Sequence, residues 1–530
     1  MWSSLSLSAS DQVSSQAIDH AALMPLYVLA GAAIAVLLAD LFVTRGRVWL
    51  LLGLSAAGST GAAVTALLIT GTGSRSSFCA AAARLRSGVD VSAACSYVTN
   101  YATTAVTVVL CVVVVVVLAL SVPLLSKESA PAGEYCFLLL CSLLGAVALL
   151  GARDLLTLIV ATEGLTLPVY VLVALGQARR GIASATTFFT VSVVSTAISL
   201  VGASLLYAVL GVVHFEQISQ VLTARPASAE MGVLYAAMTL VLAGFLFKLA
   251  TVPFHSWAPG SYDAAPLPVA AYLTTVSKVG GLFAVLLVVV GAMGDRLAQL
   301  GPVLAVLAVA SMTLGNLAAL RQHRVSRLLG WSSIAQLGYV LVPIGVLGVS
   351  GRGEVSQLLA SSMSYLGFYL VITLVVFGAL VLSRAPRDDG GALVDLAGIA
   401  VRSPWTCAAL LFGLAGLAGL PPVFAGTFAK LIVLRSLIDA GAIWLAVAVV
   451  LNAVVGLAVY GRVALACFAS SVAETASLPP CSSQRRRAPY VLAAAAVLAV
   501  SVTTAVLGLV PEPLFDICHR VASSLATLLM

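Results

Sequence analysis

Four charged side chains lie where the sequence is otherwise apolar, and their types suit proton transfer. Glu163 lies within LTLIVATEGLTLPVYVLVAL, and Lys248, Lys278 and Lys430 lie in or beside other long apolar runs. A charge at mid-membrane costs roughly 2.5–3.5 kcal/mol, so each must be paired, hydrated or neutralised. Lysine, unlike arginine, can lose its proton when it is desolvated or near another cation. The four residues predict a proton or ion path, with purely structural ion pairs as the alternative.

The two kinds of basic side chain are distributed differently along the chain. Of the 27 basic residues, 23 are arginines and four are lysines, and three of those lysines are the ones in apolar runs. If the first span starts outside, the inward loops hold 15 of the other basic residues, and the outward segments, including the residues after 510, hold 9. Because cytoplasmic loops carry an excess of lysine and arginine, this distribution predicts that both chain ends lie outside.

Helix breakers lie close to two of these lysines. Pro253 follows Lys248, and Pro421 and Pro422 precede Lys430. Proline removes a backbone donor and interrupts a helix, and broken spans can admit water at membrane depth where protein surrounds them. The two breaks lie five spans apart, which predicts two repeated units, spans 4–8 and 9–13, with the site at their interface. Ordinary proline kinks are the alternative.

Two further side chains are expected to support a proton path. His255 is seven residues from Lys248, so it would share the same helical face if the helix continued. Imidazole titrates in a range that suits a relay, and a static, hydrogen-bonded histidine is the alternative. Gln336 in SSIAQLGY cannot titrate, so its role would be to orient water.

The composition places the whole chain in a membrane. Of 530 residues, 61% are hydrophobic and 9% are charged, whereas about 25% of residues are charged in soluble domains. A span needs about 20 apolar residues, and the short connections leave no room for a soluble domain. We expect a single all-α integral membrane domain, residues 1–530, with fourteen spans: 23–43, 48–71, 102–124, 135–151, 155–175, 184–211, 231–252, 266–293, 300–320, 328–349, 355–383, 403–435, 441–468 and 489–510.

The sequence lacks the motifs of several other functional classes. It has no GxGxxG motif, no P-loop, no cysteine pattern for a metal or an iron–sulfur cluster, and no basic cluster interleaved with aromatic residues. The outside N-terminal segment 1–22 has no basic residue, which argues against a secretory signal or a transit peptide. Cys79 and Cys95 share one polar loop on the predicted outer side. We expect a disulfide between them, which would close a loop of about 15 residues, and two free thiols are the alternative.

Four long motifs resemble the antiporter-like membrane subunits of respiratory complex I, the proton-pumping NADH:quinone oxidoreductase. They are DLLTLIVATEGLTLPVYVLVAL, FKLATVPFHSWAPGSYDAAPLPVAAYLTTVSK, GNLAALRQHRVSRLLGWSSIAQLGYVL and LAGLPPVFAGTFAKL, and the similarity spans roughly residues 130–465. The N type is most similar, because span 12 carries a lysine where the M type has a glutamate, and the chain stops before the long lateral helix of the L type. The resemblance implies about fourteen helices, two inverted five-helix repeats, and broken helices 7 and 12.

The resemblance also implies roles for the buried charges. Glu163 and Lys248 would form a coupled acid–base pair, Lys278 would be the central lysine of the path, and Lys430 would lie on its exit side. Quinone reduction elsewhere in the complex would drive proton transfer through the core, residues 130–465. NADH, FMN, iron–sulfur clusters and quinone would be bound by other subunits, with no redox centre on this chain. The expected partners are membrane lipid and neighbouring M-type and K-type subunits.

Two positions depart from the family pattern. Gln336 stands where many relatives carry histidine, and Gly260 stands where relatives usually have aspartate. The main alternative is a cation/proton antiporter subunit of the Mrp type, which shares the fold and several of the charges. A structural scaffold that has lost pumping is another alternative. The expected location is a bacterial plasma membrane, with the mitochondrial inner membrane as the alternative.

Overall fold

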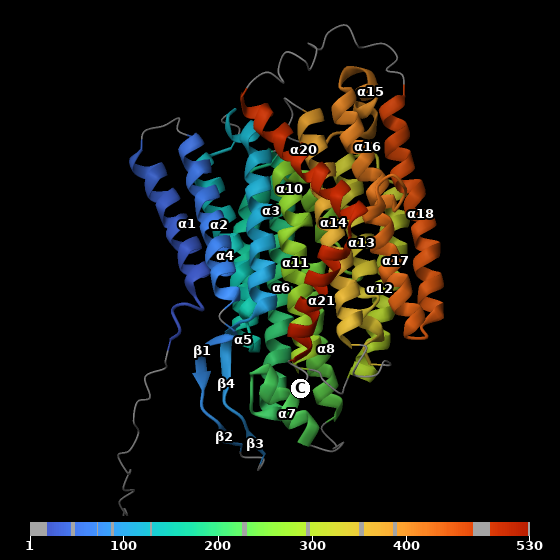
Figure 1. The fold of residues 1–530 in the computed structure, drawn as a ribbon. Coiled ribbons are helices and arrows are strands. Elements are labelled where there is room, and N and C mark those ends of the chain that lie inside the picture. Colours follow the sequence, from blue (N-terminus) through green and yellow to red (C-terminus); the bar gives the residue numbers. More distant parts are fainter. Residues whose placement is uncertain are drawn as a thin grey trace, which may run out of the picture.

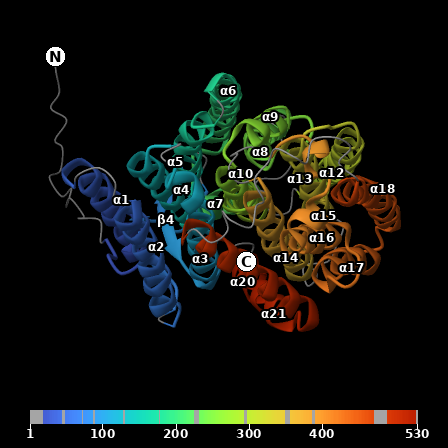
Figure 2. The same cartoon turned by 90° about the horizontal axis from the view of Figure 1, so that it is seen from above.

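The computed structural model describes residues 18–43, 48–71, 73–85, 89–127, 130–176, 178–224, 231–292, 297–348, 355–384, 390–469 and 488–527. This part of the chain is an elongated bundle of helices, with α1 and α2 at one end and α18 at the other (Figure 2). The helices of the first half are α1 (Met24–Phe42), α2 (Val48–Thr70), α3 (Tyr101–Leu125), α4 (Ala132–Gly151), α5 (Leu155–Ala174), α6 (Ala178–Leu210), α7 (Phe215–Ala224), α8 (Met231–Leu249), α9 (Trp257–Ala264), α10 (Leu267–Thr274) and α11 (Val276–Leu286), which continues into the π-helix η1 (Leu287–Ala292).

The second half has the same character. Its helices are α12 (Leu297–Leu320), α13 (Val325–Leu341), the 3₁₀ turn η3 (Ile344–Val346), α14 (Val355–Ser383), the 3₁₀ turn η5 (Leu393–Leu396), α15 (Ile399–Arg402), α16 (Pro404–Ala418), α17 (Phe424–Asp439), α18 (Ile443–Phe468), α20 (Ala488–Leu509) and α21 (Glu512–Ala526). Two small antiparallel pairs complete the described secondary structure: β1 (Arg75–Ala80) with β4 (Ala94–Thr99), and β2 (Ala83–Arg84) with β3 (Asp90–Val91).

The predicted all-α membrane fold with fourteen spans is confirmed. Thirteen described helical segments are long and apolar enough to cross a membrane. The fourteenth crossing is made by α16 and α17, which have 15 and 16 residues and are each shorter than the roughly 20 residues that a span needs. They follow one another around the predicted break at Pro421 and Pro422. The corresponding break in the first half separates α8 from α9 around Pro253.

The two five-span units must enter the membrane from opposite sides. The first unit runs from α4 to η1 and the second from α12 to α18. Because five is an odd number, the chain leaves the first unit on the side opposite to its entry. The second unit therefore begins on that other side, and the repeat is inverted.

One end of the bundle carries the strands, and we call it the hairpin end. There, Cys79 of β1 lies opposite Cys95 of β4, and the two form a disulfide. Asp19 forms an ion pair of 3.0 Å with Arg75 at the start of β1, which holds the residues before α1 against the hairpin. Of the predicted outside segment 1–22, residues 1–17 lie outside the described residues.

The final part of the chain differs from its prediction. The residues after 510 were expected outside the membrane, but α21 runs beside α14 from mid-height towards the hairpin end (Figure 1). A Cβ atom on Gly367 would lie 3.1 Å from Leu514, and the rings of Phe368 and Phe515 pack edge to face, 5.8 Å apart. Gly367 and Phe368 lie near the middle of the 29-residue helix α14, so α21 begins at membrane depth. The reason is that α20 crosses the bundle obliquely (Figure 1), and hydropathy does not determine tilt.

Candidate proton-transfer sites at the two helix breaks

Glu163 and Lys248 form a buried ion pair, as predicted from the resemblance. Lys248 Nζ lies 3.0 Å from Glu163 Oε1, with side-chain exposures of 4% and 19%. The ammonium group also donates to Thr166 Oγ1 at 3.1 Å and to Ser192 Oγ at 2.8 Å. An ammonium group has three donors and no acceptor, so these three contacts use all of its hydrogens. The hydroxyl of Thr196 donates to the same Glu163 oxygen at 2.5 Å.

Three helices position this cluster through simple helical spacing. Glu163 and Thr166 are three residues apart on α5, and Ser192 and Thr196 are four residues apart on α6. Residues three or four apart lie on one helical face, so both helices present a polar patch to the end of α8, where Lys248 lies. The interior of the first unit therefore holds a charge pair inside a shell of hydroxyl groups.

The first break supplies the binding group for Lys278. In an α-helix the carbonyl of Leu249 would accept from the N–H of residue 253, but that residue is proline and has no N–H. Lys278 Nζ, on α11, donates to this carbonyl at 2.9 Å and lies 5.0 Å from the centre of the Trp257 ring. Lys278 is fully buried, and it has no ion-pair partner within the part of the chain that the structure describes.

The second break repeats this construction. The helical donor for the Ala418 carbonyl would be residue 422, which is again a proline, and Lys430 Nζ donates to the Ala418 carbonyl instead. At both breaks the residue after the freed carbonyl has a positive φ, 60° at Ala250 and 78° at Gly419. At each break, the carbonyl four residues before the proline thus accepts from a buried or partly buried lysine at membrane depth.

Gln336 lies in a group of tyrosines next to Lys430. Its amide donates to Tyr460 OH at 2.6 Å, and its carbonyl oxygen accepts from Tyr365 OH at 2.5 Å. Tyr365, Gln336 and Lys430 line a cavity of about 10 Å³, which is the space that roughly one water molecule needs. The amide is therefore placed to connect a polar chain to the cavity beside the lysine.

His255 does not share a helical face with Lys248, because α8 ends at Leu249 and the chain turns before α9. Its ring lies 5.2 Å from the ring of Trp331 on α13. Within the described residues, neither His255 Nδ1 nor Trp331 Nε1 has a hydrogen-bond partner. His255 therefore lies between the two units, against Trp331 of the second.

Several groups in these sites were missed from the sequence. The hydroxyls of Thr166, Ser192 and Thr196 line the ion pair, and their helical spacing from one another was a detectable signal. The carbonyls of Leu249 and Ala418 could have been found by counting four residues back from each proline. The pairing of Gln336 with Tyr365 and Tyr460 had no local signal, because the three side chains come from α13, α14 and α18.

Known proteins share both the sequence and the fold of this chain. A family described as "NADH:quinone oxidoreductase/Mrp antiporter, TM" matches residues 152–456. The chain is 48% identical over 458 residues to a protein of Salinispora tropica named NADH-quinone oxidoreductase subunit N, and the match covers 85% of each chain.

Two solved structures extend the likeness to the fold. A chain of respiratory complex I from Thermus thermophilus matches with a TM-score of 0.71 and 26% identity, covering 93% of this chain and 99% of that one. A chain of the Mrp complex from Dietzia sp. DQ12-45-1b matches with a TM-score of 0.76 and 21% identity, covering 96% of this chain and 98% of that one, and this second likeness is one of fold alone. The chain belongs to the NADH:quinone oxidoreductase/Mrp antiporter family of transmembrane subunits.

Proposed function

We propose that this chain is the N-type subunit in the membrane arm of a proton-translocating NADH:quinone oxidoreductase of a bacterial plasma membrane. Glu163, Lys248, Lys278 and Lys430 carry its protons, within a translocating core of residues 130–465. The observation that supports the path most is the repeated construction at the two breaks. In each, a proline frees a carbonyl at membrane depth and a lysine donates to it.

The Glu163–Lys248 pair is the loading point of the path. Two opposite charges at 3.0 Å attract each other by roughly 4–6 kcal/mol at an effective dielectric constant near 20. Protonation of Glu163 removes this attraction, and the remaining acceptors, Thr166 and Ser192, hold the ammonium less firmly. The proton of Lys248 can then move on, because the two residues titrate as a coupled pair.

Lys278 is the next carrier because α11 packs directly on the end of α8. A Cβ atom at Gly281, one turn after Lys278, would lie 3.2 Å from backbone atoms of both Lys248 and Leu249. Among the described residues, the Leu249 carbonyl and the Trp257 ring contact the Lys278 ammonium, and no carboxylate pairs with it as Glu163 pairs with Lys248. His255 and Gln336 support the onward path to Lys430, where the small cavity gives room for a water molecule.

The redox chemistry takes place on other subunits of the complex. NADH, FMN, iron–sulfur clusters and quinone bind there, and quinone reduction supplies the energy for the proton steps. M-type and K-type subunits flank this chain in the membrane arm. The 48% sequence identity to a protein named subunit N favours this assignment over the Mrp type, for which the Dietzia structure shows a likeness of fold alone.

The test is to purify the intact assembly through an affinity tag on this chain. Reconstituted into vesicles, the assembly should oxidise NADH, reduce quinone and move protons across the membrane, and uncouplers should abolish the proton gradient while leaving NADH oxidation intact. An assembly that exchanges a metal cation for protons without oxidising NADH would contradict the proposal and identify the Mrp type.

A further inference from the structure

Helix α21 turns a charged face away from the protein at membrane depth. Glu512 and Asp516 are four residues apart, and His519 and Arg520 continue the same stripe, so all four lie on one side of the helix. All four side chains are exposed. None of the four side chains has an ion-pair or hydrogen-bond partner among the residues that the structure describes.

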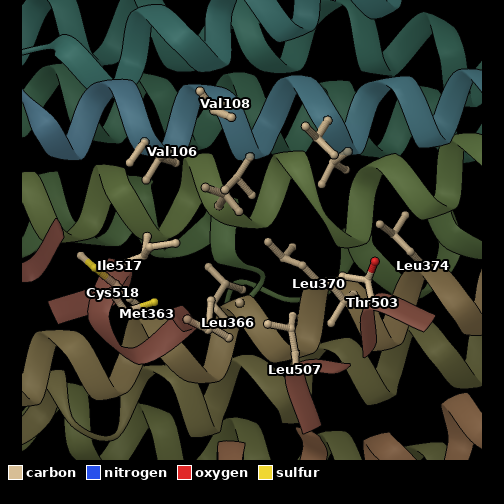
Figure 3. A pocket seen from close by; sticks show the side chains of 18 of the residues that line it. Val106, Val108, Met363, Leu366, Leu370, Leu374, Thr503, Leu507, Ile517 and Cys518 are labelled. Carbon is tan, nitrogen blue, oxygen red and sulfur yellow. The ribbon is translucent and has the colours of Figure 1, made fainter. Parts of the chain in front are cut away.

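The opposite face of α21 is apolar and covers the bundle. Leu514, Ile517, Cys518 and Val521 face an apolar cavity of about 450 Å³ between α3, α11, α14 and α20. Figure 3 shows Ile517 and Cys518 in the wall of this cavity, near Met363 and Leu366 of α14. The orientation of α21 is therefore determined by its apolar side, and the charged stripe has to face outwards.

Because α21 lies at membrane depth, its exposed charges would face lipid tails if no other molecule covered them. Leu514 and Phe515 pack on Gly367 and Phe368 near the middle of α14, so Glu512 lies at the level of the hydrocarbon core. The preceding helix ends against the second break, where a Cβ on Gly508 would lie 2.9 Å from the backbone nitrogen of Ala425. An amphipathic helix that lies in the membrane surface can keep its polar face in water, but α21 runs along a membrane-crossing helix (Figure 1). Ionised side chains at this depth face a protein partner or a water-filled space, not lipid tails.

We infer that the charged stripe of α21 docks a membrane-embedded segment of another subunit. Its charge pattern specifies the partner: a basic side chain opposite Glu512 and Asp516 at membrane depth, and an acidic or polar one opposite Arg520 nearer the hairpin end. Opposite charges across an interface set register and exclude wrong partners. This contact is separate from the proton path, because Glu512 and Asp516 face away from the bundle.

The test places a photoactivatable benzoyl-phenylalanine at Asp516 in the full chain, within the intact assembly in native membranes. After illumination, mass spectrometry should identify a membrane segment of another subunit with a lysine or arginine within one helical turn of the crosslink. The same probe at Cys518, which faces the cavity, is the control and should crosslink within this chain. Crosslinks at position 516 to lipid alone, to a second copy of this chain, or to a segment without a basic residue would overturn the inference.

Charge variants of Glu512 and Asp516 then distinguish an effect of charge sign from an effect of side-chain shape. Glu512→Lys with Asp516→Lys should reduce the copurifying partner by an order of magnitude or more, because it sets like charges against each other at a desolvated contact. Glu512→Gln with Asp516→Asn keeps the shape of both side chains and should reduce the amount of copurifying partner less. Reversing the partner's basic residue to an acid should restore retention by the lysine variant. Equal retention of the partner by the wild type and the lysine variant would also overturn the inference.

Discussion

Lys278 Nζ donates to the carbonyl oxygen of Leu249 at 2.9 Å, and Leu249 is the residue that follows Lys248. Lys278 is thus bound to the backbone of the same turn that carries Lys248. In the proposed path, movement of this turn on protonation of Glu163 and release of Lys248 would directly change the group that binds Lys278. On this proposal, coupling between the two lysines would need no intervening side chain.

Replacement of Lys278 tests whether it carries a proton. Lys278→Met should assemble but lose proton pumping on the order of 100-fold, the scale of a lost proton-transfer group. Lys278→Arg should also be impaired, since guanidinium keeps its proton. Pumping by vesicles of the purified assembly is the measurement, and Lys127→Met, outside the spans, is the matched control. Normal pumping by the methionine variant would exclude Lys278 as an obligatory carrier.

A double-mutant cycle tests the Glu163–Lys248 pair. Glu163→Ala and Lys248→Ala should each reduce proton pumping and the NADH oxidation coupled to it. The double variant should lose much less than the sum of the two losses, because the effects of contacting residues are not additive. Native gels must show that all three variants assemble. Fully additive losses in assembled protein would show that the two residues do not act together.

Pro422→Ala should weaken the site of Lys430. The substitution restores an N–H that can compete for the Ala418 carbonyl, and a hydrogen bond contributes a net 0.5–1.5 kcal/mol or so, so pumping should fall roughly 2- to 10-fold. Pro123→Ala, within α3 and outside both helix breaks, controls for the general effect of removing a helical proline. Equal effects of the two substitutions would count against a specific role for the freed carbonyl.

The Cys79–Cys95 disulfide should be present in the native protein. Alkylation under denaturing, non-reducing conditions should modify the buried free thiols Cys136 and Cys407 and leave Cys79 and Cys95 unmodified in mass spectra. Replacing both by serine should destabilise the hairpin by roughly 3 kcal/mol, as expected for a loop of about 15 residues. Alkylation of both residues without reduction would contradict the prediction.

Much of the fold could be predicted because the membrane permits few solutions. Every backbone polar group must be satisfied within the segment, so long apolar runs such as 355–383 become helices with the same bounds in the structure. The breaks could be predicted because a proline lacks a backbone donor wherever it occurs. The acceptor of Lys278 could be derived only once the packing of α11 on α8 was known, and that of Lys430 only once the packing of α17 on α16 was known.

Other parts depend on tilt and on long-range contacts, which a local pattern does not contain. The segment 489–510 was rightly predicted as helix, but its inclination in the bundle was not, so the charges of α21 were placed outside the membrane. His255 would share the face of Lys248 only if the helix continued past Pro253. The chain instead turns after Leu249, and His255 meets Trp331 of the second unit.

The acceptors around the two lysines of the first unit differ in one chemical respect. Lys248 is surrounded by the hydroxyls of Thr166 and Ser192, and a hydroxyl can reverse from accepting to donating when its neighbour changes charge. The carbonyl that binds Lys278 can accept only. The Thr166 and Ser192 hydroxyls can therefore rotate and donate to a neutral Lys248 amine. The Leu249 carbonyl cannot donate to a neutral Lys278 amine. In the proposed path, the first site can therefore offer either a donor or an acceptor to its lysine, whereas the Leu249 carbonyl offers only an acceptor to the charged and the neutral amine alike.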